Sequence, residues 1–158
     1  MDALRLSYLG LLDDVAASLD RLSQLAREKT DAVRQDDLIA LDEVLKQDQA
    51  MALNLRGLEQ RRLKLAKQLG LEGTSLSDLP KHYEGQLEDR AWQTVERLRE
   101  SYTVYRSCAD MARSALELDL HKIEKVIAAS GVDPAVAASG YEAPGVEPPS
   151  KMKTDFRA

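Results

Sequence analysis

Apolar residues recur along most of the chain at alternating steps of three and four, the period of one face of an α-helix. The first stripe predicts a helix over about residues 2–34 and comprises Tyr8, Leu12, Val15, Leu19, Leu22, Ala26 and Val33. The second predicts a helix over about residues 37–69 and comprises Leu41, Val44, Met51, Leu55, Leu58, Leu65 and Leu69. Lys29 interrupts the first stripe, whereas Asp48 and Arg62 take seam positions of the second, where polar residues can set the register of paired helices.

A turn is expected near residues 35–37, because the second stripe is out of phase with the first. Asp36 or Asp37 is the expected N-cap of the second helix. The segment VRQDDL contains no Gly or Pro, so one continuous helix over residues 2–69 is the alternative. Gly70 and Gly73 then end the second helix, and Ser75 or Ser77 is expected to cap a short helical turn before Pro80.

The third stripe predicts the longest helix, over about residues 86–129, closed by Ser130 and Gly131. It comprises Ala91, Val95, Leu98, Tyr102, Tyr105, Ala109, Ala112, Leu116, Leu120, Ile123 and Ile127. Tyr102 and Tyr105 are therefore expected in the core. This helix would be about 65 Å long and each of the first two about 50 Å, so in a bundle of antiparallel helices its last turns would have no partner in their own chain.

Those last turns carry an apolar face with charged residues on the other sides of the helix. At 100° per residue, the face comprises Leu116, Leu120, Ile123 and Ile127, with Val126 at its edge. An apolar helix face without an intramolecular partner is an aggregation risk unless another molecule covers it. The same stripe suits binding of a client segment or formation of a homodimer, and sequence alone does not separate these alternatives.

The end of the chain has a different composition. Residues 140–158 contain Pro144, Pro148 and Pro149 and few apolar side chains, so they are expected to be disordered in the free protein. The pattern as a whole predicts an all-α protein: one bundle domain over residues 1–131, with three long coiled-coil-like helices and a short helical turn, followed by a flexible tail over residues 132–158.

Composition narrows the possible functions. Charged residues make up 31% of the chain and aromatic residues 4%, which is typical of long helices. The net charge of −5 argues against general affinity for nucleic acid, and the basic run EQRRLKLAK is interpreted as a solvated helix face. No glycine-rich phosphate loop or metal-ligand spacing is present, and His82, His121 and Cys108 are isolated. We therefore expect no cofactor, no bound metal and no enzymatic activity.

The expected compartment is the cytoplasm. The single cysteine excludes an intramolecular disulfide framework and fits a reducing environment. The N-terminal segment has no basic region before an apolar run, so it is not expected to act as a signal peptide. No stretch approaches the roughly twenty apolar residues needed to cross a bilayer, so no membrane insertion is expected.

Taken in order, these features resemble the FlgN family of flagellar type III export chaperones. The resemblance rests on the acidic turn at Asp36 and Asp37, on the second helix QDDLIALDEVLKQDQAMALNLRGLEQRR, on the LEGTSLSDL break, on the very long third helix and on the GYEAPG segment. Within these, the matching positions are Leu41, Leu58, Glu59, Arg61, Arg62, Tyr141 and Gly145. The resemblance covers nearly the whole chain.

The resemblance implies a chaperone for the flagellar hook-associated proteins that form the hook-filament junction. It implies that the client's C-terminal amphipathic segment is bound, kept from assembling early and delivered to the flagellar export gate. The family's client-binding region corresponds to Leu116, Leu120, Ile123, Val126 and Ile127, and its late tyrosine, associated with docking at the gate, corresponds to Tyr141. A coiled-coil adaptor or self-associating scaffold without a secretion role is the alternative, and for the tail a purely solubilising end is the alternative.

Overall fold

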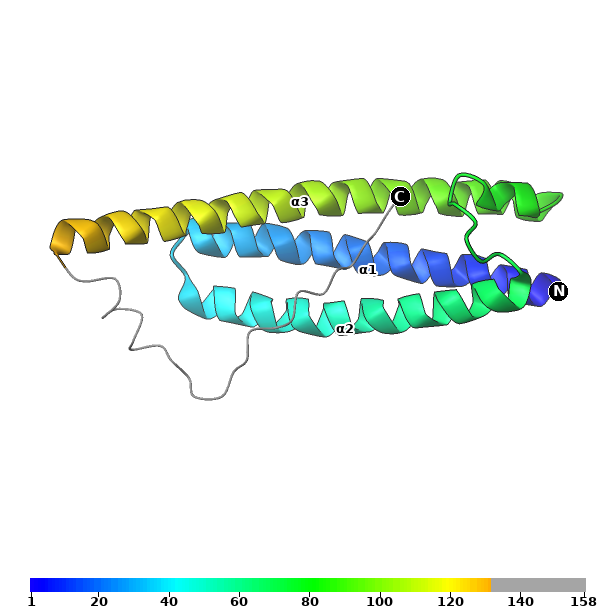
Figure 1. Ribbon diagram of the computed structural model, residues 1–158, viewed down its shortest axis with the longest axis horizontal. Coiled ribbons are helices and arrows are strands. Elements are labelled where there is room, and N and C mark those ends of the chain that lie inside the picture. The colour runs from blue at the N-terminus through cyan, green and yellow to red at the C-terminus, as the bar shows by residue number, and fades with distance from the viewer. Residues whose placement is uncertain (132–158) are drawn as a thin grey trace. The chain divides into compact units, whose positions relative to one another are not determined.

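The computed structural model describes residues 1–131 of the chain. It contains three long helices, α1 (Asp2–Arg34), α2 (Leu38–Leu69) and α3 (Gln86–Ser130), and a short 3₁₀ helix η1 (Leu79–His82) between α2 and α3 (Figure 1). The predicted all-α fold of three long helices with a short helical turn is confirmed. The predicted tail, residues 132–158, lies outside the described residues.

The chain forms two compact units. The first, Met1–Leu116, contains α1, α2, η1 and most of α3, and the second begins at Glu117. Of the second unit the structure describes residues 117–131, which are the end of α3 and Gly131. That residues 1–131 form one domain stays a prediction.

The α1–α2 connection is a tight turn, as the phase change between the two stripes predicts. The Asp37 carboxylate accepts a hydrogen bond from the Ala40 N–H at 3.0 Å and so caps α2. Asp36, at the middle of the turn, has φ of 53°, a left-handed conformation that Asp tolerates better than most residues. The continuous helix considered as the alternative is wrong.

The segment after α2 also follows the sequence, with one difference. Gly70 ends α2 with φ of 68°, and the Leu71 N–H donates to the Ala66 carbonyl at 2.8 Å. The Ser75 hydroxyl accepts from the Asp78 N–H at 3.3 Å. It therefore caps the turn before η1, whereas Pro80 lies inside η1 and not after it.

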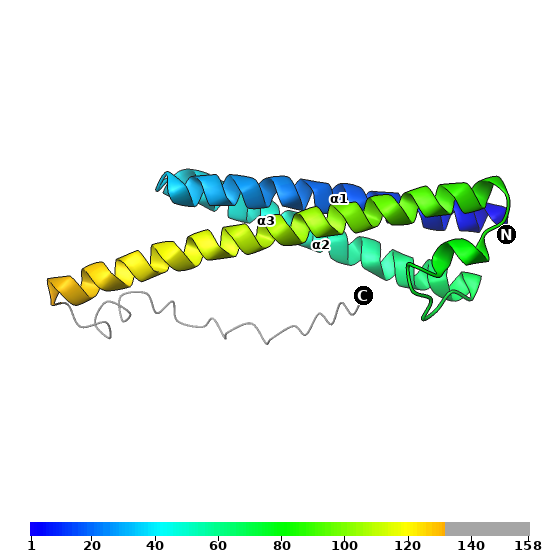
Figure 2. The same ribbon diagram turned by 90° about the horizontal axis from the view of Figure 1, so that it is seen from above.

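Polar contacts between the helices show their relative direction within the first unit. Ser18 accepts from Asn54 at 3.1 Å and Lys29 bonds Asp48 at 3.0 Å, so α1 and α2 are antiparallel. Along α3 the order is the reverse, because Arg97 pairs with Asp13 whereas Ala26 packs with Cys108. Residues 86–116 of α3 therefore run parallel to α1, as Figures 1 and 2 show.

Helix α1 is the central element of the first unit, because it packs against both α2 and α3. It buries more than the single stripe that its sequence predicts; the additional buried residues are Leu9, Leu11, Ala16, Ser18, Ser23, Leu25, Thr30 and Ala32. The Ser23 and Thr30 hydroxyls donate to the carbonyls one turn earlier, at 2.9 and 3.0 Å. These bonds satisfy polar groups that would otherwise be costly to bury.

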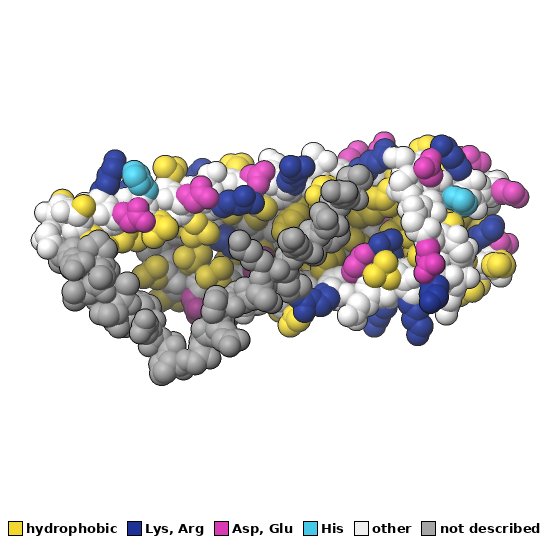
Figure 3. Space-filling view, in the orientation of Figure 1, with side chains coloured by type: hydrophobic (Ala, Val, Ile, Leu, Met, Phe, Trp, Pro, Cys, Tyr) yellow, Lys and Arg dark blue, Asp and Glu magenta, His cyan; other side chains and the backbone are white. Residues whose placement is uncertain are grey.

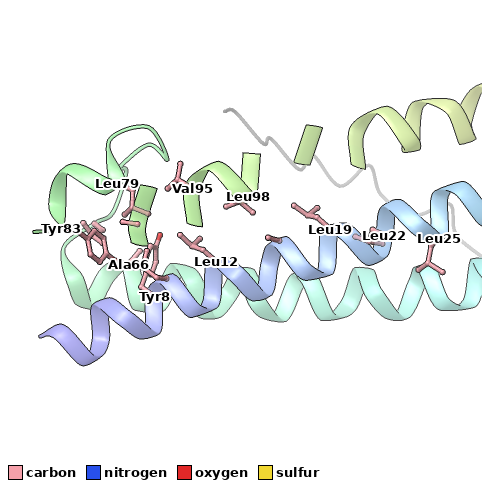
Figure 4. Packing of buried hydrophobic residues seen from close by; sticks show 14 of the residues in the cluster. Tyr8, Leu12, Leu19, Leu22, Leu25, Ala66, Leu79, Tyr83, Val95 and Leu98 are labelled. Atoms are coloured by element: carbon pink, nitrogen blue, oxygen red, sulfur yellow. The ribbon is translucent and has the colours of Figure 1, made fainter. Parts of the chain in front are cut away.

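The connection between α2 and α3 fills one end of the core. Leu71, Leu79 and Tyr83 are buried in one cluster with Ala66 of α2 and Val95 of α3, and Figure 4 shows this packing. The Tyr83 hydroxyl donates to the Arg5 carbonyl at 3.2 Å, and burial raises the pKa of Tyr83 to about 12. The loop over residues 70–85 thus packs on α2 and on the beginning of α3, and it forms a fourth layer beside the three helices of the first unit.

The aromatic residues further along α3 differ from the prediction. Tyr105 is half-buried against the core, whereas Tyr102 is 39% exposed and does not belong to it. Tyr102 lies beyond the part of α3 that the loop covers. That part ends near Arg99, which donates a hydrogen bond to the Ser77 hydroxyl of the loop at 2.5 Å. The expectation that Tyr102 is a core residue is therefore wrong.

Candidate functional site

The predicted binding residues lie on the last turns of α3. We define the late face as Leu116, Leu120, Ile123, Val126 and Ile127. Helical geometry places the first three and Ile127 within a narrow arc, with Val126 at its edge. Leu116 is the last residue of the first unit, and the other four belong to the second.

The late face is largely open to solvent. Leu116 is 38% exposed, Leu120 57%, Ile123 51% and Val126 67%, whereas Ile127 is intermediate. Ala112 is the last buried residue of α3, and no residue from Arg113 to Ser130 is buried. The apolar stripe thus continues for about four turns beyond the point where α3 contributes to a core, which leaves side chains that another apolar surface could cover.

Charged residues occupy the remaining sides of this part of α3. Lys122, Glu124 and Lys125 are exposed, and His121 and Glu124 form only a wide contact, with Nδ1 and Oε2 4.0 Å apart. Exposed pairs of this kind contribute little to stability. The second unit therefore offers a surface for apolar association with a charged border.

The single cysteine of the chain is a buried packing residue, and the two histidines lie on the surface. Cys108 is buried in a small cluster with Ala26 of α1 and Ala112 of α3, so it acts as a packing residue between these helices. His82 and His121 are both exposed. Within residues 1–131 no three His, Cys, Asp or Glu side chains are grouped as a metal site would require. None of the described helices combines the length and apolar character needed to cross a membrane.

The basic run in α2 is divided between two environments. Arg61, Lys64 and Lys67 are exposed, in agreement with the solvated face expected from the sequence. Arg62 differs: its guanidinium bonds Glu59 at 2.6 and 2.8 Å and Tyr8 at 3.3 Å. These partners, Glu59 first, raise the pKa of Arg62, and they connect α2 to α1 at a seam position, as the sequence indicates.

The structure also contains a surface that the sequence did not indicate, an open cleft between α2 and α3 in the first unit. We define the α2–α3 cleft by Leu38, Leu41 and Leu45 on α2 and by Tyr102, Tyr105 and Leu116 on α3. Among the described helices only α1 and α2 approach closely along their backbones. Figure 3 shows hydrophobic side chains in the hollow between α3 and α2, beyond the part that the loop fills.

The exposure of the side chains differs between the end of the cleft that the loop fills and the end beyond it. Under the loop, Ala66, Val95 and Leu98 are buried, whereas beyond it Leu41 and Tyr105 are only half-buried and Leu45 is 41% exposed. Leu38, in the first turn of α2, is 77% exposed. Burial raises the pKa of Tyr105, and the negative charge of Asp48 on α2 adds to this effect. Tyr105 is therefore close enough to α2 for the charge of Asp48 to act on it.

A seven-residue spacing was the available signal for this cleft. Leu38 and Leu45 lie seven apart beside the predicted stripe of α2, and Tyr102, Ala109 and Leu116 repeat the same interval within the stripe of α3. An apolar row beside a stripe, as on α2, indicates a helix that packs in two directions. Only the structure shows that the loop covers one end of the cleft and leaves the other uncovered.

Tyr141, the residue predicted to dock at the export gate, lies outside the described residues. Its neighbours Gly140 and Gly145 lie there as well. Its role is therefore not tested by the geometry.

Comparison with known proteins identifies the family. No curated protein and no solved structure gives a significant match to the chain. The family model described as FlgN protein matches residues 5–149, a range that includes α2, α3 and all of α1 except its first three residues. The chain therefore belongs to the FlgN family, whose members are flagellar export chaperones that bind export substrates and are not enzymes.

Proposed function

We propose that this protein is a cytoplasmic chaperone that binds the C-terminal amphipathic segments of the flagellar hook-filament junction proteins and delivers them to the export gate. The late face carries the client. The observation in support is that four of its five side chains are exposed although they form one apolar stripe. A client helix with apolar residues at i, i+3, i+4 and i+7 fits such a stripe.

The exposed fractions limit the affinity of this face. Full burial of an aliphatic side chain contributes about 1.5–3 kcal/mol, and roughly half of that remains available where half of the side chain is already covered. Four such side chains give about 3–6 kcal/mol, and the client's own apolar side chains add a similar amount. Ordering of the client costs about 2–5 kcal/mol. The balance is an affinity between about millimolar and micromolar, which permits release at the gate.

Ile123→Asp tests the late face. The variant places a charge in the middle of the stripe, so it should weaken binding of a junction-protein C-terminal segment at least about tenfold. Lys122→Asp on the same helix is the matched control and should bind nearly as the wild type does. Isothermal titration calorimetry measures binding and circular dichroism measures helix content. Unchanged binding by Ile123→Asp contradicts the site, and unfolding of Ile123→Asp alone would assign the residue to an intramolecular core.

Docking at the gate is assigned to Tyr141 on the resemblance to the family. Tyr141→Ala should leave client affinity within about 1 kcal/mol, as expected for independent sites, while it reduces secretion of junction proteins and motility. Normal secretion from a Tyr141→Ala strain removes this role and leaves the tail as a solubilising end.

A scaffold function predicts a different result in the absence of client. In that case the late face would pair with a second copy, and light scattering at micromolar concentration would show a dimer that Ile123→Asp converts to monomer. A monomeric wild type that binds the junction-protein segment excludes the scaffold.

A further inference from the structure

We propose that the open part of the α2–α3 cleft is a second client-binding surface, and that it takes an amphipathic helix whose apolar stripe is flanked by acidic residues. The inference rests on the proposed chaperone function but concerns residues other than those of the late face, except Leu116, which borders both surfaces. All of them lie in the first unit, Met1–Leu116.

The first argument is the unequal filling of the cleft. The loop packs Leu71, Leu79 and Tyr83 in one cluster with Ala66 of α2 and with Val95 and Leu98 of α3, and all of these residues are buried. Past Arg99 nothing in the described chain continues this fourth layer. Tyr102, at 39%, and Leu45, at 41%, are exposed there although both flank core stripes. A helix in this position would complete the packing that the loop begins.

The second argument is size. The uncovered stretch of α3 runs from about Arg99 to Leu116, which at 1.5 Å per residue is about 26 Å. A helix of about 18 residues has that length. Such a segment is long enough to present five or six apolar residues to the cleft, and it need not be ordered before it binds.

The third argument is charge, which selects the occupant. Arg99, Arg106 and Arg113 are exposed and repeat at seven-residue intervals on α3, next to Tyr102 and Leu116. They therefore form a basic row along the α3 border of the cleft, in a protein whose net charge is −5. Within this row Arg113 pairs with Asp110 of the same helix at 3.5 Å, an exposed pair that is weak enough for a ligand carboxylate to compete with it. Across the cleft, the Asp42 carboxylate is paired with Lys46 at 2.9 Å. A bound helix with carboxylates beside its apolar stripe complements the arginine row, whereas a basic helix is repelled.

The late face alone gives a reason for a second surface. Its apolar area supports only weak binding, as worked out above, whereas a chaperone must hold its client against assembly. Contacts at the cleft would raise the affinity of the same client, because the second contact becomes intramolecular once the first has formed.

A synthetic peptide tests the chemistry of the cleft on the full-length protein. The probe is an amphipathic peptide of about 18 residues with leucine at i, i+3, i+4 and i+7 and glutamate beside the stripe; the comparison peptide has lysine in place of glutamate. Calorimetry at low salt should show the glutamate peptide binding at least about tenfold more tightly, with the difference shrinking as salt rises. Equal binding of the two peptides overturns the charge assignment.

Two pairs of variants locate the binding. Arg106→Glu should weaken the glutamate peptide about tenfold, whereas Arg90→Glu, an exposed residue of α3 outside the cleft, should change it less than about twofold. Leu45→Glu should also weaken binding about tenfold, whereas Leu53→Glu, which is 66% exposed on α2, should not. Retained binding by both cleft variants overturns the proposal.

The junction-protein segment separates this proposal from the proposed function. Loss of segment binding in Ile123→Asp with full binding in Arg106→Glu and Leu45→Glu rejects the cleft and leaves the chaperone function intact. The opposite result is also possible: the wild type does not bind the junction-protein segment but binds the glutamate peptide selectively. This result rejects the proposed chaperone function and leaves the α2–α3 cleft as a site for acidic amphipathic helices.

Two other occupants are also tested. A dimer that Leu45→Glu dissociates would assign the cleft to a second copy and overturn the proposal. If the glutamate peptide adds no amide-exchange protection to α2 beyond that of the free monomer, the chain covers its own cleft, which overturns the proposal as well.

Discussion

The Lys29–Asp48 pair is predicted to fix the register of α1 against α2. Lys29 Nζ and Asp48 Oδ2 are 3.0 Å apart, and the two side chains retain 16% and 33% of their exposure. Asp48 also faces Tyr105 at the α2–α3 cleft, so a register shift would disturb the proposed binding surface. The perturbation is a double-mutant cycle of Lys29→Met and Asp48→Leu, whose new side chains roughly preserve the apolar volume.

The expected magnitude follows from the distance and the burial. Two unit charges 3.0 Å apart attract by about 1.4 kcal/mol at the dielectric of water and by about 5.5 kcal/mol at an effective dielectric of 20. Partial desolvation and the ordering of Lys29 reduce this gain. We expect a coupling free energy of about 1–2 kcal/mol. Asp48→Leu should be the more damaging single change, by about 2–3 kcal/mol, because it leaves the less exposed ammonium without its partner.

Urea unfolding followed by circular dichroism measures the four free energies of unfolding in the cycle. The double variant should lie within about 1 kcal/mol of the wild type, since replacing a buried pair by apolar side chains is often neutral. The double variant should bind the junction-protein segment more weakly than the wild type despite its similar stability, because one of the polar contacts that fix the register is then missing. A coupling below about 0.3 kcal/mol would refute the reasoning and place the pair with ordinary surface ion pairs.

Three further predictions concern stability. Leu12→Ala should reduce the free energy of unfolding by about 2–5 kcal/mol because Leu12 is fully buried, whereas Leu53→Ala should cost below about 0.5 kcal/mol; equal costs in denaturant unfolding would contradict the packing. Asp37→Ala removes the bond to the Ala40 N–H and should cost about 0.5–2 kcal/mol, and no measurable loss would mean that the cap is dispensable. The raised pKa of Tyr83, about 12 against 10.0, means that the folded state retains the phenolic proton longer. The contribution of this group to the free energy of unfolding is therefore complete below pH 10 and falls as the pH rises from about 10 to 12. Tyr83→Phe should make the thermal unfolding midpoint depend less on pH across that range. An unchanged dependence on pH in the variant would exclude Tyr83 as the cause.

The fold follows from local signals that are strong in this chain. The apolar stripes predict where the helices form and which side of each helix is buried, and the phase change between the first two stripes predicts the turn between them. Asp37 and Gly70 then supply the chemistry of the helix ends, an accepting carboxylate and a left-handed φ. Each of these depends on residues within one or two helical turns of each other, which is why they can be predicted without the tertiary structure.

The candidate site is predictable only in part. The late face of α3 is visible in the sequence because its five residues share one side of one helix. The α2–α3 cleft is not, because its walls come from helices that the chain connects through the loop over residues 70–85. The exposure of Tyr102 has the same origin: its stripe position indicated a core residue, and only the extent of the loop decides what covers it.

Sequence by itself determined that this chain forms three long helices, where they turn and which family it belongs to, because period, caps and breaks act over short distances. Tertiary structure alone decided that α1 is buried on two sides, that Arg62 reaches Tyr8, and that the loop fills one end of the α2–α3 cleft and leaves the other open. These outcomes depend on which helices meet and at what distance. That choice is made by long-range packing, in which one apolar stripe can pair with several others of the same period.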